Sequence, residues 1–201
     1  MNKLFLTLVA FTFMAGNACA AGAKSSPKAK APAQQYKSYA MDKDYFTCSV
    51  PGDWNLKRDA ENDEEYKIYE IELVAPKSEK TPTAIFVSYY AKDSDDFAGY
   101  QDFVDSNKKN ALGETKSKRE SYDPVKNIKL GGREAFELNC ERMVYLHPES
   151  KSDESVQLKE KHYVLPAKEG FYVLHFTAAK TLFAQYAPVF EKVAKSFKPK
   201  F

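Results

Sequence analysis

The chain has 201 residues, of which 43% are hydrophobic, 14% aromatic and 29% charged, with a formal net charge of +2. This composition is typical of one globular domain, because it is too polar for a membrane-embedded protein and too aromatic for a disordered one. The near-neutral charge also argues against a dedicated nucleic-acid binder, which normally carries a strongly basic surface.

The first twenty residues predict an export signal. Lys3 precedes an apolar run over 4–14, and Ala18-Cys19-Ala20 offers the small residues that a signal peptidase reads. The run is too short to span a bilayer. We therefore expect residues 1–20 to be a signal peptide cleaved near Ala20, and the mature protein to be periplasmic or otherwise extracytoplasmic.

Cys19 leaves a second route open. A bacterial lipoprotein signal also ends in cysteine, although no leucine lies three residues before Cys19. Membrane attachment is expected only if Cys19 is lipidated.

Residues 21–41 predict a flexible linker rich in Ala, Lys and Pro. Pro27 and Pro32 interrupt any helix, and the stretch lacks the apolar periodicity that a packed element needs. Its lysines favour a solvated tether, with attraction to anionic lipid as the alternative. Residues 42–201 are then expected to form a single folded domain.

Apolar alternation predicts three strands at the start of this domain, over 45–50, 67–74 and 83–90. In the first strand, Phe46, Cys48 and Val50 share one face before the turn at Pro51-Gly52. The acidic segment 59–65 between the first two strands predicts a solvated loop.

A helix is expected over 95–112. Ser94 is a suitable N-cap, and Phe97, Tyr100, Phe103 and Val104 recur at helical spacing before Gly113. We interpret Asp93, Asp95 and Asp96 as complements of the helix dipole, because a calcium loop needs a longer pattern that ends in glutamate.

The second half predicts two hairpins and a closing helix. Strands over 125–130 and 133–146 flank Gly131-Gly132, the residue type of a tight turn, and strands over 156–165 and 171–178 follow. Helical spacing begins at Thr181, and Pro188 is expected to divide this helix so that its second part covers 188–198.

Four segments of this pattern resemble the PsbP-like family of exported proteins, which includes DcrB-like members. They are the opening Tyr45-Phe46-Thr47-Cys48-Ser49-Val50-Pro51-Gly52-Asp53-Trp54, the Gly132-Arg133 hairpin through Leu138, the last strand Gly170-Phe171-Tyr172-Val173-Leu174, and the closing helix Phe190 to Phe197. The resemblance implies an α+β fold, an α/β/α sandwich whose antiparallel sheet of about six to seven strands has helices on both faces. It also implies a binding or assembly role and carries over no catalytic residue.

The three histidines limit acid–base and metal chemistry. His162 and His175 lie on the two arms of one predicted hairpin, and they face each other if paired residue numbers sum to 337. A register sum of 336 places them on opposite faces. Because two ligands are too few for a metal ion, no metal site is predicted.

No other motif points to chemistry. The sequence has neither a Gly-x-Ser-x-Gly elbow nor a glycine-rich phosphate loop. We therefore predict no catalytic residue, no cofactor and no enzymatic activity.

Cys48 and Cys140 remain after signal cleavage, and both point to apolar sides of predicted strands. Export permits a disulfide between them, and two buried thiols are the alternative.

The sequence thus predicts an exported, non-catalytic binding or assembly module that contacts another, unidentified protein of the cell envelope. The alternative is an enzyme or small-molecule carrier with a pocket that the sequence does not reveal.

Overall fold

The computed structural model describes residues 34–201, so the predicted signal peptide, Cys19 and most of the predicted linker lie outside the described residues. This part of the chain contains three α-helices and eleven strands: β1 (Tyr36–Ala40), β2 (Phe46–Pro51), β3 (Asn55–Lys57), α1 (Ala60–Tyr66), β4 (Ile68–Val74), β5 (Ala84–Ala91), α2 (Tyr100–Asn107), β6 (Glu120–Tyr122), β7 (Lys126–Leu130), β8 (Arg133–Tyr145), β9 (Ser155–Ala167), β10 (Gly170–Ala179), α3 (Lys180–Ser196) and β11 (Lys198–Pro199).

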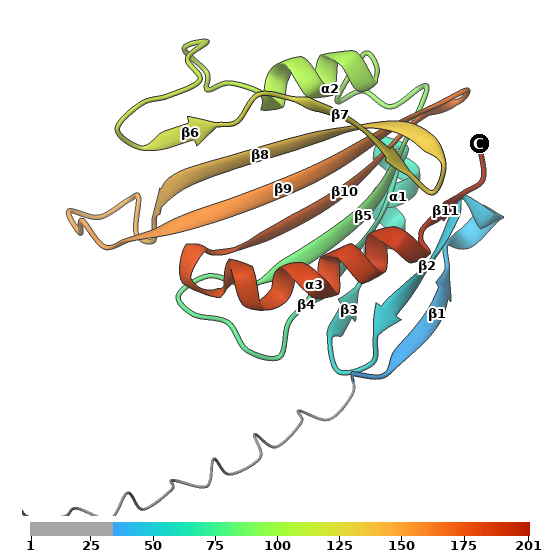
Figure 1. Cartoon of the computed structure of the whole chain (residues 1–201), viewed down its shortest axis with the longest axis horizontal. Coiled ribbons are helices and arrows are strands. Elements are labelled where there is room, and N and C mark those ends of the chain that lie inside the picture. Colours follow the sequence, from blue (N-terminus) through green and yellow to red (C-terminus); the bar gives the residue numbers. More distant parts are fainter. Residues whose placement is uncertain (1–33) are drawn as a thin grey trace, which may run out of the picture. The chain divides into compact units, whose positions relative to one another are not determined.

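An eight-stranded sheet forms the centre of the fold (Figure 1). Its strands follow the order β3-β4-β5-β10-β9-β8-β6, and β7 also pairs with β8. A second sheet has the order β1-β2-β11. Every strand pair in the described residues is antiparallel. The predicted α+β class with an antiparallel sheet is confirmed, although the central sheet has eight strands rather than six or seven.

Alternation along β10 separates two hydrophobic cores. Tyr172, Leu174 and Phe176 belong to the larger core on the side of α3, whereas Phe171 and Val173 belong to a smaller core on the side of α2. Figure 1 shows α2 above the long strands β8, β9 and β10 and α3 below them. The predicted helices on both faces are therefore confirmed. We call these two sides of the central sheet the α3 face and the α2 face.

The small sheet helps to close the α3 face. Phe46, Cys48 and Val50 of β2 are buried in the larger core, as the predicted alternation requires. β1 pairs with β2 over 36–40, so part of the segment predicted as a linker is a strand. The prediction was wrong here because a five-residue edge strand with two half-buried tyrosines leaves too weak a pattern in the sequence.

Two further predictions need correction near the N-termini of helices. The segment predicted as an acidic loop is α1, which begins after Asp59, whose side chain accepts a hydrogen bond from the Asn62 amide. α2 covers 100–107 rather than 95–112 and starts after Gly99, so Ser94 is not its N-cap.

α3 runs without a break past Pro188, which was predicted to divide it. Proline in a helix removes the hydrogen bond to the carbonyl four residues earlier. That carbonyl belongs to Ala184, which is exposed, so water can replace the missing donor. The apolar stripe on the opposite side, which includes Phe190 and Val193, stays packed.

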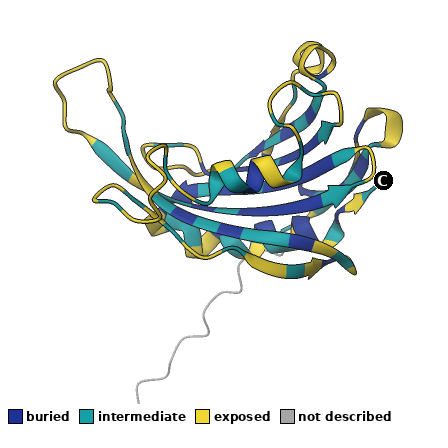
Figure 2. Ribbon diagram, turned by 90° about the horizontal axis from the view of Figure 1, so that it is seen from above, coloured by how far each residue is buried: buried dark blue, intermediate teal, exposed yellow. Residues whose placement is uncertain are grey.

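Both predicted hairpins are confirmed. Gly131 and Gly132 have φ values of 58° and 83°, the positive values that a two-residue hairpin turn requires at both positions. Figure 2 shows dark blue, buried stretches along the strands and yellow, exposed residues in the loops. None of the helices in residues 34–201 is long and apolar enough to cross a membrane.

Candidate functional site

The β9–β10 hairpin brings two histidines together. His162 lies directly opposite His175, which is the pairing with a register sum of 337. Their ring centroids are 4.0 Å apart and the ring planes differ by 8°. The third histidine, His147, lies in the exposed loop before β9, where its ring pairs with Glu154. The structure thus assembles the two strand histidines and excludes the loop histidine from the site.

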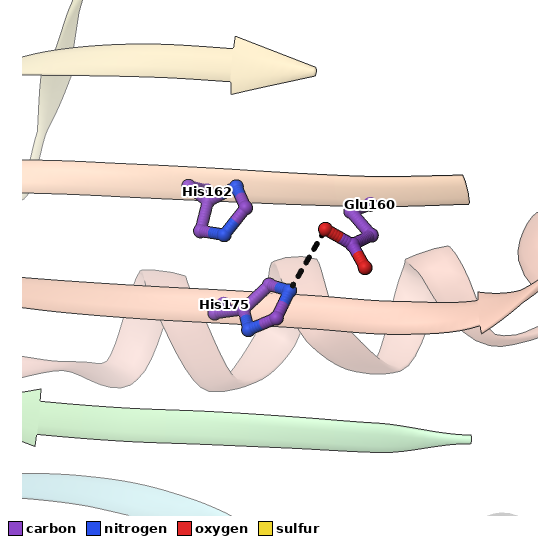
Figure 3. A group of neighbouring side chains, drawn as sticks. All are labelled: Glu160, His162 and His175. Atoms are coloured by element: carbon purple, nitrogen blue, oxygen red, sulfur yellow. Dashed lines mark ion pairs between the residues drawn. The ribbon is translucent and has the colours of Figure 1, made fainter. Parts of the chain in front are cut away.

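Glu160 completes the group, because it precedes His162 by two residues on β9 and therefore shares its face of the sheet. The ligand atoms of Glu160, His162 and His175 all lie within 4.8 Å of one another (Figure 3). His175 Nε2 is 3.7 Å from Glu160 Oε2. Within residues 34–201, this is the one such group of three potential metal ligands.

The two oxygens of Glu160 have different surroundings. Arg142 donates to Oε1 through Nε at 3.0 Å and through Nη2 at 2.7 Å, and the Thr177 hydroxyl donates to the same oxygen at 3.4 Å. Oε2 accepts from the Cys140 thiol at 3.6 Å and faces His175. Glu160 is only 3% exposed, so these contacts replace most of its hydration. Oε1 therefore accepts the hydrogen bonds that fix the carboxylate, whereas Oε2 accepts, within residues 34–201, only the long hydrogen bond from the Cys140 thiol.

Burial and charge set the protonation of this cluster. Burial alone raises the pKa of Glu160, but His175 and Arg142 outweigh it and lower the pKa to about 2. Burial, reinforced by the neighbouring His175, holds the pKa of His162 well below its usual value of 6.5. Burial and the Glu160 charge raise the pKa of Cys140 to about 12. At neutral pH the site holds a carboxylate, a neutral imidazole at His162 and a protonated thiol.

Aromatic rings hold the imidazoles in a row across the sheet. Phe86 of β5 stacks on His175, with centroids 5.4 Å apart and planes at 18°. Phe103 of α2 meets His162 edge-on at 6.1 Å. Because Phe103 belongs to the smaller core, His162 lies at the border between the part of the α2 face that α2 covers and the part that it leaves open.

We call the open part the polar half-face. Its members are polar or half-buried side chains that cross-strand pairing places on one side of six strands, namely Glu70, Glu72, Phe86, Ser88, His175, Thr177, Glu160, His162, Cys140, Arg142, Glu120 and Tyr122. Antiparallel sheets often have one face that is only partly covered. Here the reason is the length of α2, which has eight residues.

Two hollows lie on this half-face. One, of about 640 Å³, is bordered by the C-terminal end of α2, by β6 and by Cys140, Glu160 and His162. The other, of about 700 Å³, lies between α1 and strands β4 and β5 and includes Glu70 and Phe86. His175 on β10 stands between them, because it pairs with Phe86 on one side and His162 on the other.

Glu70 is a second buried carboxyl group on this half-face, with a different environment. It accepts a hydrogen bond from the Ser88 hydroxyl at 2.6 Å. Burial outweighs this bond and raises the pKa of Glu70 above its usual value. Unlike the environment of Glu160, the environment of Glu70 disfavours the ionised form of the carboxyl group.

The cysteines are not joined. Cys48 and Cys140 are both buried free thiols. Cys48 lies in the larger core on the α3 face, whereas Cys140 lies on the α2 face beside Glu160. The central sheet separates them, so the alternative of a disulfide between them is wrong.

Comparisons with known proteins assign no family. No family model matches the chain, and no curated protein does. Solved structures with a similar arrangement include CyanoP, the cyanobacterial PsbP from Synechocystis sp. PCC 6803, with 12% identity, a TM-score of 0.49 and coverage of 88% of this chain and 98% of that one.

Two other solved structures are similar over comparable lengths. LpqN of Mycobacterium tuberculosis, involved in cell envelope biogenesis, has 15% identity, a TM-score of 0.46 and coverage of 82% of this chain and 90% of that one. The Saccharomyces cerevisiae Ran-binding protein Mog1p has 11% identity, a TM-score of 0.46 and coverage of 83% and 96%. The resemblance to the PsbP-like family stays a prediction.

Proposed function

We propose that this chain is an exported, non-catalytic binding protein of the cell envelope that recognises a partner protein through the polar half-face. The observation that carries the proposal is the half-covered α2 face, where fixed polar side chains line two open hollows. Charged and aromatic groups held in place by a rigid sheet recognise a partner at low entropic cost.

The chemistry of the half-face supports binding rather than catalysis. The Cys140 thiol has its pKa raised to about 12, and a protonated thiol is a weak nucleophile. The Ser88 hydroxyl donates to Glu70, and Glu160 is held by Arg142. The Cys140 thiol, the Ser88 hydroxyl and the Glu160 carboxylate are therefore engaged with other protein groups.

Export is part of the proposal and rests on the signal-peptide pattern of residues 1–20. If Cys19 is lipidated, the same module is tethered to a membrane by residues that precede β1. In both cases the polar half-face is expected to meet a partner outside the cytoplasm.

Affinity capture from the cell envelope of the producing organism, with the full chain as bait, tests this proposal. The double variant Glu120→Lys/Tyr122→Ala alters two half-buried residues of the polar half-face, and Gln185→Ala/Lys195→Glu alters two exposed residues of α3 as a matched control. We expect the first variant to reduce capture of the partner at least tenfold and the control to leave it unchanged. Equal losses in the two variants would place the interface elsewhere.

A small-molecule carrier is the second candidate. The two hollows, of about 640 and 700 Å³, have the size of ordinary ligand pockets, which is about 300–1,000 Å³. Native mass spectrometry of the full chain purified from its own cells discriminates the two candidates. A non-covalent mass larger than that of a metal ion, which disappears on unfolding, favours the carrier.

A further inference from the structure

The geometry around β9 and β10 is that of a metal site. Glu160 and His162 project from alternate positions of β9, and His175 lies opposite His162 (Figure 3). The buried Nε2 of His175 has no hydrogen-bond partner within the described residues, yet it lies 3.7 Å from Glu160 Oε2. A nitrogen and an oxygen bound to one tetrahedral zinc ion are about 3.4 Å apart, so the separation of these two atoms is close to what one ion requires.

We propose that Glu160, His162 and His175 bind one Zn²⁺ ion. Two imidazoles and a carboxylate are ligands that zinc accepts in proteins, whereas Ca²⁺ and Mg²⁺ require sites made mainly of oxygen. One ligand atom from each residue lies within 4.8 Å of the other two, so closing these distances by about 1.4 Å or less, with the stacked imidazole rings tilted toward a common point, gives the spacing of a tetrahedral zinc site. This proposal goes beyond the proposed function and does not depend on it.

Arg142 acts on Glu160 from outside the ligand set. Its guanidinium occupies Oε1 and leaves Oε2 directed at His175. Outer partners of this kind orient metal ligands and contribute to affinity. Arg142 is thus a positioning residue of the zinc site.

The ion has a route to the site. The hollow of about 640 Å³ opens onto Glu160, His162 and Cys140, so binding does not require unfolding. The Cys140 sulfur approaches Glu160 but does not belong to the group of mutually close ligand atoms. The three-residue set therefore predicts that Cys140→Ser retains zinc.

Titration of the full chain with ZnCl₂, monitored by isothermal calorimetry, tests the proposal. The protein is produced without a polyhistidine tag and freed of metal by a chelator. We expect one Zn²⁺ per chain, undiminished by excess MgCl₂ or CaCl₂. His175→Gln and Glu160→Gln should each weaken zinc at least about tenfold, since removing even an outer partner of a metal ligand causes losses of this size.

His147→Gln is the matched control, because His147 is exposed and does not belong to the group of three ligand residues. It should bind zinc as the unaltered chain does. Circular dichroism of each variant verifies folding, and His175 is the most informative position because its side chain is 21% exposed, against 4% for Glu160.

Three results would overturn the proposal: no zinc uptake by the unaltered chain, the same zinc affinity in His175→Gln and His147→Gln, or loss of zinc in Cys140→Ser. These readouts do not involve the envelope partner. Failure of the zinc site and failure of partner capture are therefore distinguishable.

Discussion

The two faces of the central sheet are covered to different extents. On the α3 face, a 17-residue helix and a second sheet close an apolar core, in which Phe176, Phe190 and Val193 are fully buried. On the α2 face, a helix of eight residues covers one end and leaves polar side chains at the other. The extent of the covering element therefore decides which side chains a face can hold. The α3 face holds the larger hydrophobic core, and the polar half-face keeps polar side chains beside two hollows.

Most buried polar groups follow the same division. Of the five buried polar residues in the described part of the chain, Ser88, Glu160 and His162 lie on the polar half-face, whereas Asp63 lies in α1 and Thr83 precedes β5. Burying such groups without partners is costly, so each must be matched by a neighbour or by a ligand. Ser88 and Glu160 have protein partners. Substitutions on the two faces should accordingly change the free energy of unfolding by different amounts and for different physical reasons.

The largest effect is expected on the α3 face. Val193→Asp places a charge where the native side chain is fully buried among apolar groups, so the free energy of unfolding should fall by about 4 kcal/mol or more. Ala184→Asp on the exposed side of the same helix should change it by no more than about 0.5 kcal/mol. Urea unfolding measures both. Similar values for the two variants would show that α3 does not pack as described.

On the polar half-face, Arg142→Met should lower the free energy of unfolding by about 2 kcal/mol. It leaves the buried Glu160 carboxylate without its main cationic partner, but the Arg142 side chain is 44% exposed, so the loss is smaller than the about 3–5 kcal/mol of a fully buried pair. Lys126→Met breaks a more exposed ion pair with Glu137, which lies on β8 as Arg142 does. This change should lower the free energy of unfolding by about 0.5 kcal/mol or less. A comparable cost in the two variants would contradict a special role of Glu160.

Glu70→Gln should stabilise the protein at pH 7. Burial raises the folded-state pKa of Glu70 above the unfolded value of about 4.5, so the folded state binds the proton more tightly and pays for the charge at neutral pH. As the pH falls below the unfolded pKa, the carboxyl is protonated in both states and the advantage of glutamine disappears. Urea unfolding at pH 7 and pH 4 checks this sign.

Glu65→Gln, on the exposed surface of α1, controls for the loss of one negative charge. Stabilisation by Glu70→Gln that persists unchanged at pH 4, or that Glu65→Gln reproduces, would exclude burial of Glu70 as the cause.

The smallest effect concerns the two cysteines, which the central sheet keeps apart. Adding a reductant should leave the unfolding temperature unchanged, because Cys48 and Cys140 are not bonded to each other. Alkylation followed by peptide mass spectrometry should label both residues after unfolding without reductant. A peptide pair linked through Cys48 and Cys140 would refute this arrangement.

Strong local patterns made much of the fold predictable. Alternation located β2 and β4, and Gly131-Gly132 located the β7–β8 turn. Strands of three to five residues, such as β1, β3 and β6, were missed because they are too short to show a period. The predicted division of α3 at Pro188 was wrong because the exposed Ala184 carbonyl can bond to water instead. That exposure depends on the tertiary structure and is not visible in the sequence.

The candidate site was predictable only in part. His162 and His175 were paired in one of two registers, and a slip of one residue moves a side chain to the other face, so sequence alone did not decide between them. Glu160 was missed, although its position two residues before His162 on a predicted strand was a usable signal. Arg142 joins from a different hairpin, and nothing local in the sequence connects it with Glu160.

Hydrogen exchange of the full chain, with and without its captured envelope partner, tests the central claim most directly. If the polar half-face is the binding surface, the partner should slow exchange in β6 and in the segments 140–142 and 157–162, and leave α3 and β2 unchanged. Protection confined to α3 or to the small sheet would contradict the account, because it would place recognition on the α3 face.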